Sequence, residues 1–166
     1  WFEPEIVPRV ARPGARRPAA DSIADYARNA TALSRLGHAA PLRTLAYPYG
    51  ETRFDLKLAL PARFSAARGI MPGLNEGRVD LAQLRAFPFF GADAALRLSP
   101  VLARAAARKA WLIVFTHDVE DKPSAWGTTG GALDKLLRDA RARGFDILPL
   151  AAACDHAIAK DQTCAA

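Results

Sequence analysis

The fold is decided by the stretch Trp111-Leu112-Ile113-Val114-Phe115-Thr116-His117-Asp118. Its first five residues are apolar and rich in β-branched and aromatic side chains, which predicts a short buried strand. The polar residues Thr116, His117 and Asp118 follow that strand directly. Polar side chains at a strand end are typical of α/β proteins, whose chemistry lies beyond the carboxyl ends of parallel strands.

Strand and helix signals alternate on both sides of this stretch. Apolar runs predict further strands at 42–46, 64–67, 84–89 and 145–148, and helical spacing predicts helices at 22–36, 52–60, 99–109, 129–144 and 151–158. We expect Asp21 or Ser22 to cap the first helix, and Ser99-Pro100 to begin the third. The alternation predicts an α/β domain with a largely parallel sheet.

Composition divides the chain into three segments. Residues 1–20 hold four prolines among arginines, a density that prevents a regular helix and predicts an extended arm or linker. The α/β domain is expected over residues 21–158, and residues 159–166 form a tail. No apolar run is long enough to cross a bilayer. The first nine residues do not read as a secretory signal, so the sequence assigns no compartment.

The formal net charge of +6 permits an acidic partner such as nucleic acid or an anionic polysaccharide. Arginines are, however, spread along the whole chain and do not gather around aromatic residues, as a single-strand binder requires. The sequence therefore argues against nucleic-acid binding.

The chain has two cysteines, Cys154 and Cys164. They could form one disulfide in an oxidising compartment, or remain two unpaired thiols. Two cysteines at this spacing are too few for a zinc ribbon.

His117 is the candidate catalytic residue. Its imidazole can exchange a proton near neutral pH, which suits a general acid. The alternative is a histidine that hydrogen-bonds the backbone of the loop. Because side chains alternate along a strand, Asp118 should point away from His117 and tie the following loop. His38 and His156 lie far from a second histidine in the sequence and are interpreted as structural.

Two aromatic residues in turns could contact a sugar. Pro48 rigidifies the turn at residues 47–50, so Tyr49 could shape a sugar site, or its backbone amide could hold an oxyanion. Alternatively, the Tyr49 ring packs on the rim of the fold. Trp126 lies in a polar loop, where its indole could stack on a sugar face or cover the end of the core.

The order of these motifs resembles that of the NodB-like polysaccharide deacetylases (carbohydrate esterase family four). Residues 42–50 are similar to the third family motif, which ends in Pro-Tyr-Gly after a strand. Residues 111–119 are similar to the last motif, in which a buried strand delivers the catalytic histidine. Five further segments resemble one bacterial subgroup, namely 68–70, 72–75, 77–81, 123–129 and 143–149. The resemblance covers residues 21–153.

The resemblance implies the later half of a distorted (β/α) barrel with fewer than eight strands. It also implies hydrolysis of N- or O-acetyl groups on a carbohydrate, with a divalent metal such as zinc and an aspartate base. His117 would protonate the leaving amine, and the backbone at Tyr49 would help to hold the oxyanion. Pro48 and Trp126 would contact the substrate; Tyr47 and Asp118 would support the site.

The chain departs from the family pattern at the motifs that bind the metal. It lacks the Thr-Phe-Asp-Asp motif and the pair of histidines four residues apart, and Ala46 stands where many members have arginine. We therefore expect no metal site formed by this chain alone. The missing N-terminal half, or a second copy, would cover the open sheet edge. The alternative is a non-catalytic remnant or carbohydrate-binding module.

Overall fold

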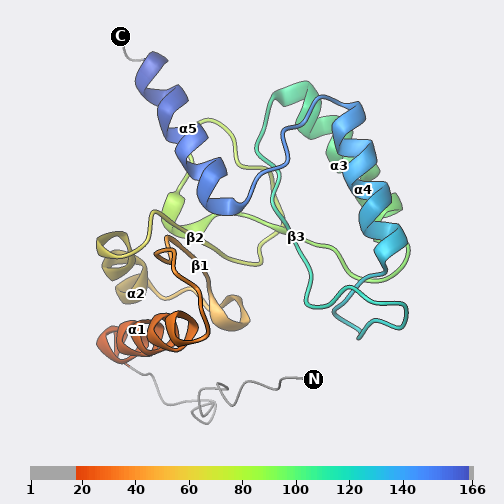
Figure 1. Ribbon diagram of the computed structural model, residues 1–166. Helices are drawn as coiled ribbons and strands as arrows, with labels where there is room; N and C mark the ends of the chain where they lie inside the picture. The colour runs from red at the N-terminus through yellow and green to blue at the C-terminus, as the bar shows by residue number, and fades with distance from the viewer. Residues whose placement is uncertain (1–17, 165–166) are drawn as a thin grey trace.

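The computed structural model describes residues 18–164 as a layer of short strands between helices (Figure 1). The helices are α1 (Ala19–Arg35), α2 (Phe54–Ala59), α3 (Ala94–Arg108), α4 (Gly130–Ala142) and α5 (Leu150–Cys164). The strands are β1 (Thr44–Ala46), β2 (Ala66–Arg68), β3 (Phe87–Pro88) and β4 (Val114–Phe115), and the 3-10 turns are η1 (Pro48–Gly50), η2 (Leu60–Ala62) and η3 (Leu81–Gln83). Most of the arm predicted at residues 1–20 lies outside the described residues.

The four strands form two parallel pairs that follow one another along the chain. β1 pairs with β2, and β3 pairs with β4, both in parallel. A parallel bridge between Arg68 and Leu84 joins the two pairs, and the Leu84 amide donates to the Ala67 carbonyl at 2.8 Å. Because all pairings are parallel, the carboxyl ends of the strands share one edge. Within residues 18–164 the layer does not close into a barrel, so the fold is α/β in the general sense.

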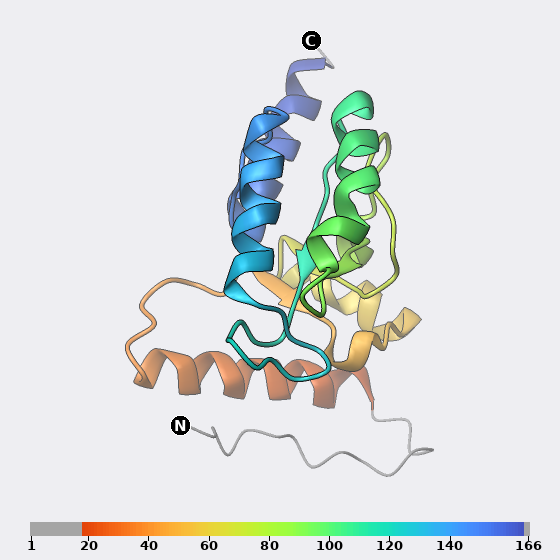
Figure 2. The ribbon, with the colours of Figure 1, turned by 90° about the vertical axis from the view of Figure 1, so that its right-hand side faces the viewer.

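Helices cover both faces of the strand layer, because neighbouring residues of a strand point to opposite sides. Ala67 packs in a cluster with side chains of α1 and α2, whereas Ala66 packs with Cys154 of α5. In the same way Val114 packs against α3 and α4, and Ile113 packs on the α5 side. α1 to α4 therefore cover one face, and α5 covers the other. The helices α3 and α4 lie side by side in both views (Figures 1 and 2).

The predicted start of the third helix is wrong. α3 begins at Ala94, and Pro100 lies inside it. The apolar face that buries this helix already includes Ala94 and Ala95, so tertiary packing extends the helix ahead of the proline. Pro100 and Leu96, four residues before it, are both exposed, so water can reach the carbonyl group that the proline leaves without a donor.

Two other local predictions are also wrong. Neither Asp21 nor Ser22 caps α1, which starts after Pro18 without a side-chain cap. Residues 145–148 are not a strand: Phe145 packs against the α3 and α4 cluster, while the residues after it are exposed and pair with no strand among the described residues.

The disulfide considered for the two cysteines is not compatible with α5. Cys154 and Cys164 lie in the same helix, ten residues and therefore about 15 Å apart along its axis. A disulfide requires Cα atoms within about 7 Å. Cys154 is a buried free thiol, and burial raises the pKa of that thiol.

Replacing Thr129 by alanine should lower the free energy of unfolding by about 1 kcal/mol. At the helix start that the sequence predicts, the Thr129 side chain caps α4 by accepting a hydrogen bond of 3.2 Å from the Ala132 amide. Urea denaturation would measure the loss. The control is Thr31→Ala on the exposed side of α1, for which we expect a change within about 0.5 kcal/mol. Equal losses in the two variants would contradict the capping role.

Candidate functional site

Four rings gather where β3 and β4 end. The Phe90 ring is central: its centroid lies 5.5 Å from that of Phe115, 6.0 Å from that of His117 and 5.7 Å from that of Trp126. We call Phe90, Phe115, His117 and Trp126 the ring cluster. Trp126 is 62% exposed and His117 is also exposed, so the cluster forms an open platform at the shared carboxyl edge of the strands.

Backbone hydrogen bonds fold the loop after β4 back on itself and bring Trp126 to His117. The His117 amide donates to the Trp126 carbonyl at 3.2 Å, and the Thr128 amide donates to the Asp118 carbonyl at 2.9 Å. The buried Thr128 hydroxyl donates to the Gly91 carbonyl at 2.9 Å, which attaches the loop to the residues that follow β3. Figure 2 shows this teal loop below the first turns of α3 and α4.

Asp118 ties this loop internally. Its carboxylate accepts hydrogen bonds from the Ser124 amide at 2.8 Å and from the Ser124 hydroxyl at 2.6 Å. These bonds hold the pKa of Asp118 below its ordinary value. A side chain at the buried Gly127 would collide with the carboxyl group, so the loop needs glycine there. This is the tie that alternation along the strand predicts, and Asp118 directs its oxygens at Ser124.

Ser124→Ala should raise the pKa of Asp118 towards its ordinary value of 3.8, because the serine hydroxyl is the largest cause of the depression. A lowered carboxyl pKa stabilises the folded loop at pH values above the ordinary pKa. That stabilisation is lost as the pH falls through the lower pKa of the folded protein. An NMR titration of the Asp118 carboxyl carbon would measure the change. Ser34→Ala on α1 should leave it unaltered, and an unchanged Asp118 titration in Ser124→Ala would contradict the assignment.

His117 presents its imidazole to solvent within the ring cluster. Among residues 18–164 the ring forms no hydrogen bond to the loop backbone, and only the His117 amide is bonded to it. The Phe90 ring lies against one side of the imidazole at an interplanar angle of 51°. The described structure therefore leaves the ring nitrogens of His117 accessible to a bound molecule.

Arg68, at the end of β2, extends the ring cluster. Its guanidinium carbon lies 4.6 Å from the centroid of the Phe115 ring. Arg68 is half-buried, and burial lowers its pKa. The sequence motifs include Arg68 only within residues 68–70, and they do not single out Phe90. Their positions at the ends of neighbouring parallel strands are the signal that could have placed both at this edge.

The turn that contains Pro48 and Tyr49 follows β1, which belongs to the other strand pair. β1 pairs with β2, whereas the ring cluster lies where β3 and β4 end. Tyr49 is exposed, with a left-handed φ of 55°. Among the described residues, no aromatic ring contact joins Tyr49 to the ring cluster. The structure thus brings together His117, Asp118 and Trp126, and it does not join Pro48 or Tyr49 to them.

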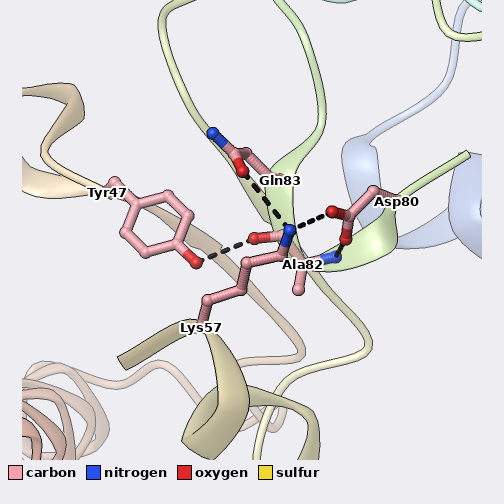
Figure 3. Close-up of polar contacts among 5 residues, drawn as sticks. All are labelled: Tyr47, Lys57, Asp80, Ala82 and Gln83. Atoms are coloured by element: carbon pink, nitrogen blue, oxygen red, sulfur yellow. Dashed lines mark hydrogen bonds and ion pairs between the residues drawn. The ribbon is translucent and has the colours of Figure 1, made fainter. Parts of the chain in front are cut away.

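Tyr47 is buried and belongs to a separate polar group (Figure 3). Its hydroxyl donates to the Ala82 carbonyl at 2.7 Å, and burial raises the pKa of Tyr47 to about 12. Asp80 accepts from the Ala82 amide at 3.0 Å and pairs with Lys57, which also donates to Gln83 at 3.4 Å. Tyr47 therefore attaches the β1 turn to η3 from within the core and does not reach the ring cluster.

No family model, curated protein or solved structure matches this chain. In the described part, no helix is both long and apolar enough to cross a membrane. The function therefore has to be inferred from the geometry of the ring cluster and from the order of the sequence motifs.

The residues that the structure describes do not fit the metal site implied by the resemblance. Among the described side chains of residues 18–158, no group of three or more His, Cys, Asp or Glu is placed to hold a metal ion. A catalytic zinc is usually held by three protein ligands. The chemistry available at the ring cluster is that of its own side chains: aromatic stacking, proton exchange at His117 and anion binding at Arg68.

Proposed function

We propose that this chain is the later half of a polysaccharide deacetylase-type domain, and that its ring cluster binds an acetylated carbohydrate. The observation that carries the proposal is the position of His117, exposed beside Trp126 and Phe90 at the carboxyl edge of the strands. Aromatic faces stack on the apolar faces of sugar rings. An exposed imidazole in the same cluster can exchange a proton with the bound sugar.

In the deacetylase function, His117 acts as the general acid. Hydrolysis of an acetamide consumes one water and releases acetate and an amine, and the nitrogen takes up a proton as the C–N bond breaks. The imidazolium of His117 donates that proton, and the Trp126 carbonyl holds the His117 backbone in place. The proposal assigns the aspartate base and the metal ligands, which belong to the first two family motifs, to a segment outside these 166 residues.

The second candidate is a carbohydrate-binding protein without turnover. The specific observation in its favour is that the described residues do not assemble a metal site. Both candidates require the ring cluster to bind a sugar, and they differ in whether acetate is released.

The test combines calorimetric binding of N-acetylchitotetraose with an assay of acetate release, with added zinc and again with chelator. We expect Trp126→Ala to weaken binding about tenfold, as the loss of one aromatic contact of about 1.4 kcal/mol would do. The exposed Phe54, remote from the cluster on α2, provides the control variant Phe54→Ala, which should bind normally.

The outcomes separate the candidates. Zinc-dependent acetate release that is lost in His117→Ala would support the deacetylase function. Binding without release would favour the non-catalytic alternative. If N-acetylchitotetraose does not bind, or binds equally well after Trp126→Ala, the ring cluster is not the carbohydrate site.

A further inference from the structure

We propose that Arg68 forms a subsite for the carboxylate of an acidic sugar, so that the carbohydrate bound at the ring cluster is anionic. The inference rests on the proposed carbohydrate-binding function and adds the chemical class of the ligand. It rests on three observations about Arg68: its hydrogen-bonding and ionic partners, the ring against which its guanidinium lies, and its position beside the ring cluster.

Arg68 is a half-buried cation that has no carboxylate partner among the described side chains of residues 18–158. Several other arginines do have such a partner, for example Arg43 with Asp155 and Arg108 with Glu76. The hydrogen bond of Arg68 is a long one of 3.4 Å, from Nη1 to the Gly69 carbonyl. Removing a charge from water without a counter-ion is unfavourable, so a half-buried guanidinium in this state is suited to receive an anion.

The electrostatic surroundings agree with this interpretation. Burial is the cause that lowers the pKa of Arg68, with no opposing contribution from an acidic neighbour. Asp118, the carboxylate next to His117 in the loop after β4, is already bonded to Ser124. The whole chain carries a net charge of +6, which favours the approach of an anionic polymer.

The guanidinium is held by an aromatic ring. The guanidinium carbon of Arg68 lies 4.6 Å from the centroid of the Phe115 ring, a cation–π contact that holds the group beside the ring cluster. A guanidinium edge matches the two oxygens of a carboxylate, which it can bind through two parallel hydrogen bonds. A lysine at this position would supply charge without that geometry.

The position of Arg68 links the anion to the sugar. Phe115, under the guanidinium, contacts Phe90, and Phe90 contacts both Trp126 and His117. A saccharide that stacks on Trp126 and Phe90 therefore has Arg68 at the far side of the same platform. A carboxylate could come from an acidic sugar or from free acetate, and the platform of rings favours the sugar.

Calorimetry on the 166-residue chain can distinguish an acidic sugar from free acetate as the source of the bound carboxylate. The probes are tetragalacturonate, the neutral N-acetylchitotetraose and sodium acetate. We expect tetragalacturonate to bind at least about tenfold more tightly than the neutral tetramer, because one guanidinium–carboxylate pair strengthens its binding. Acetate should bind far more weakly than either tetramer.

Three variants test whether Arg68 causes the preference for tetragalacturonate. Arg68→Gln should abolish the preference for tetragalacturonate and leave binding of the neutral tetramer within about twofold, and Arg68→Lys should retain part of it. Arg104→Gln removes the same charge from an exposed position on α3 and should keep the preference. Circular dichroism and thermal unfolding check that each variant is folded.

Each unfavourable outcome has a distinct meaning. Equal binding of the two tetramers would overturn the inference and leave the proposed function standing. A preference lost equally in Arg104→Gln would overturn it in favour of general charge attraction. Acetate that binds as tightly as tetragalacturonate through Arg68 would overturn the acidic sugar in favour of acetate. If neither tetramer binds, both the inference and the proposed function fail.

Discussion

Phe89→Ala is expected to lower the free energy of unfolding by about 3–5 kcal/mol. Phe89 is only 1% exposed and lies in the largest buried cluster, between the end of β3 and the helices α3 and α4. Its amide donates to the Phe115 carbonyl at 2.8 Å, so the backbone there is held by the strand pairing and cannot move in to fill the cavity. Domains have only about 5–15 kcal/mol of stability, so this loss is a large fraction of the total.

Urea denaturation followed by circular dichroism would measure the effect of Phe89→Ala. The matched control is Phe54→Ala, which removes the same side chain at a site that is 78% exposed and should change stability by less than about 0.5 kcal/mol. Phe89→Leu keeps most of the volume and should lose about 1 kcal/mol, which provides a measurable value if the alanine variant does not fold. Similar losses for Phe54→Ala and Phe89→Ala would contradict the position of the core.

The parts of the fold that could be predicted are those that local chemistry determines. The run of apolar residues at 111–115 predicts a strand, and the structure pairs its last two residues in β4 with a further bridge at Trp111. Thr129 predicts a helix start because its hydroxyl accepts a bond from the third residue of the helix, and the bond is present. Each of these signals involves residues close together in the sequence.

The wrong predictions are those in which packing between distant segments outweighs a local signal. Ser99-Pro100 has the chemistry of a helix start, but Ala95 and Leu98 pack against α4 and extend α3 ahead of the proline. Residues 145–148 have the composition of a strand, but only Phe145 finds a place in the core, and no described strand lies beside them.

The candidate site was only partly predictable for the same reason. His117, Asp118 and Trp126 lie in the same loop, so their proximity follows from their positions in the sequence. Arg68 and Phe90 come from other strands, and a contact across strands requires knowledge of their order. The structure also places Tyr49 in the turn after β1, in the other strand pair from His117, whereas the family resemblance assigns both residues to one site.

Between about pH 10 and pH 12, the free energy of unfolding is expected to fall by about 2 kcal/mol because of Tyr47. Tyr47 is 3% exposed, and burial raises its pKa from 10.0 to about 12 in the folded protein. Above pH 10 the unfolded chain loses the phenol proton while the folded chain keeps it. The contribution of this group is therefore complete below pH 10 and is lost as the pH rises through 12.

Tyr47→Phe separates this effect from the titration of the lysines. The variant leaves the Ala82 carbonyl without its 2.7 Å hydrogen bond, so it should be about 1 kcal/mol less stable than the parent at pH 8. It has no proton to lose, so its stability should fall less steeply and the two curves should converge or cross near pH 12. Tyr49→Phe, at an exposed tyrosine, should follow the parent at every pH. Urea denaturation across this range, with phenolate absorbance recorded in parallel, would measure the three curves. If the curve of Tyr47→Phe runs parallel to that of the parent throughout, the Tyr47 phenol is not the group that makes the fold sensitive to alkali.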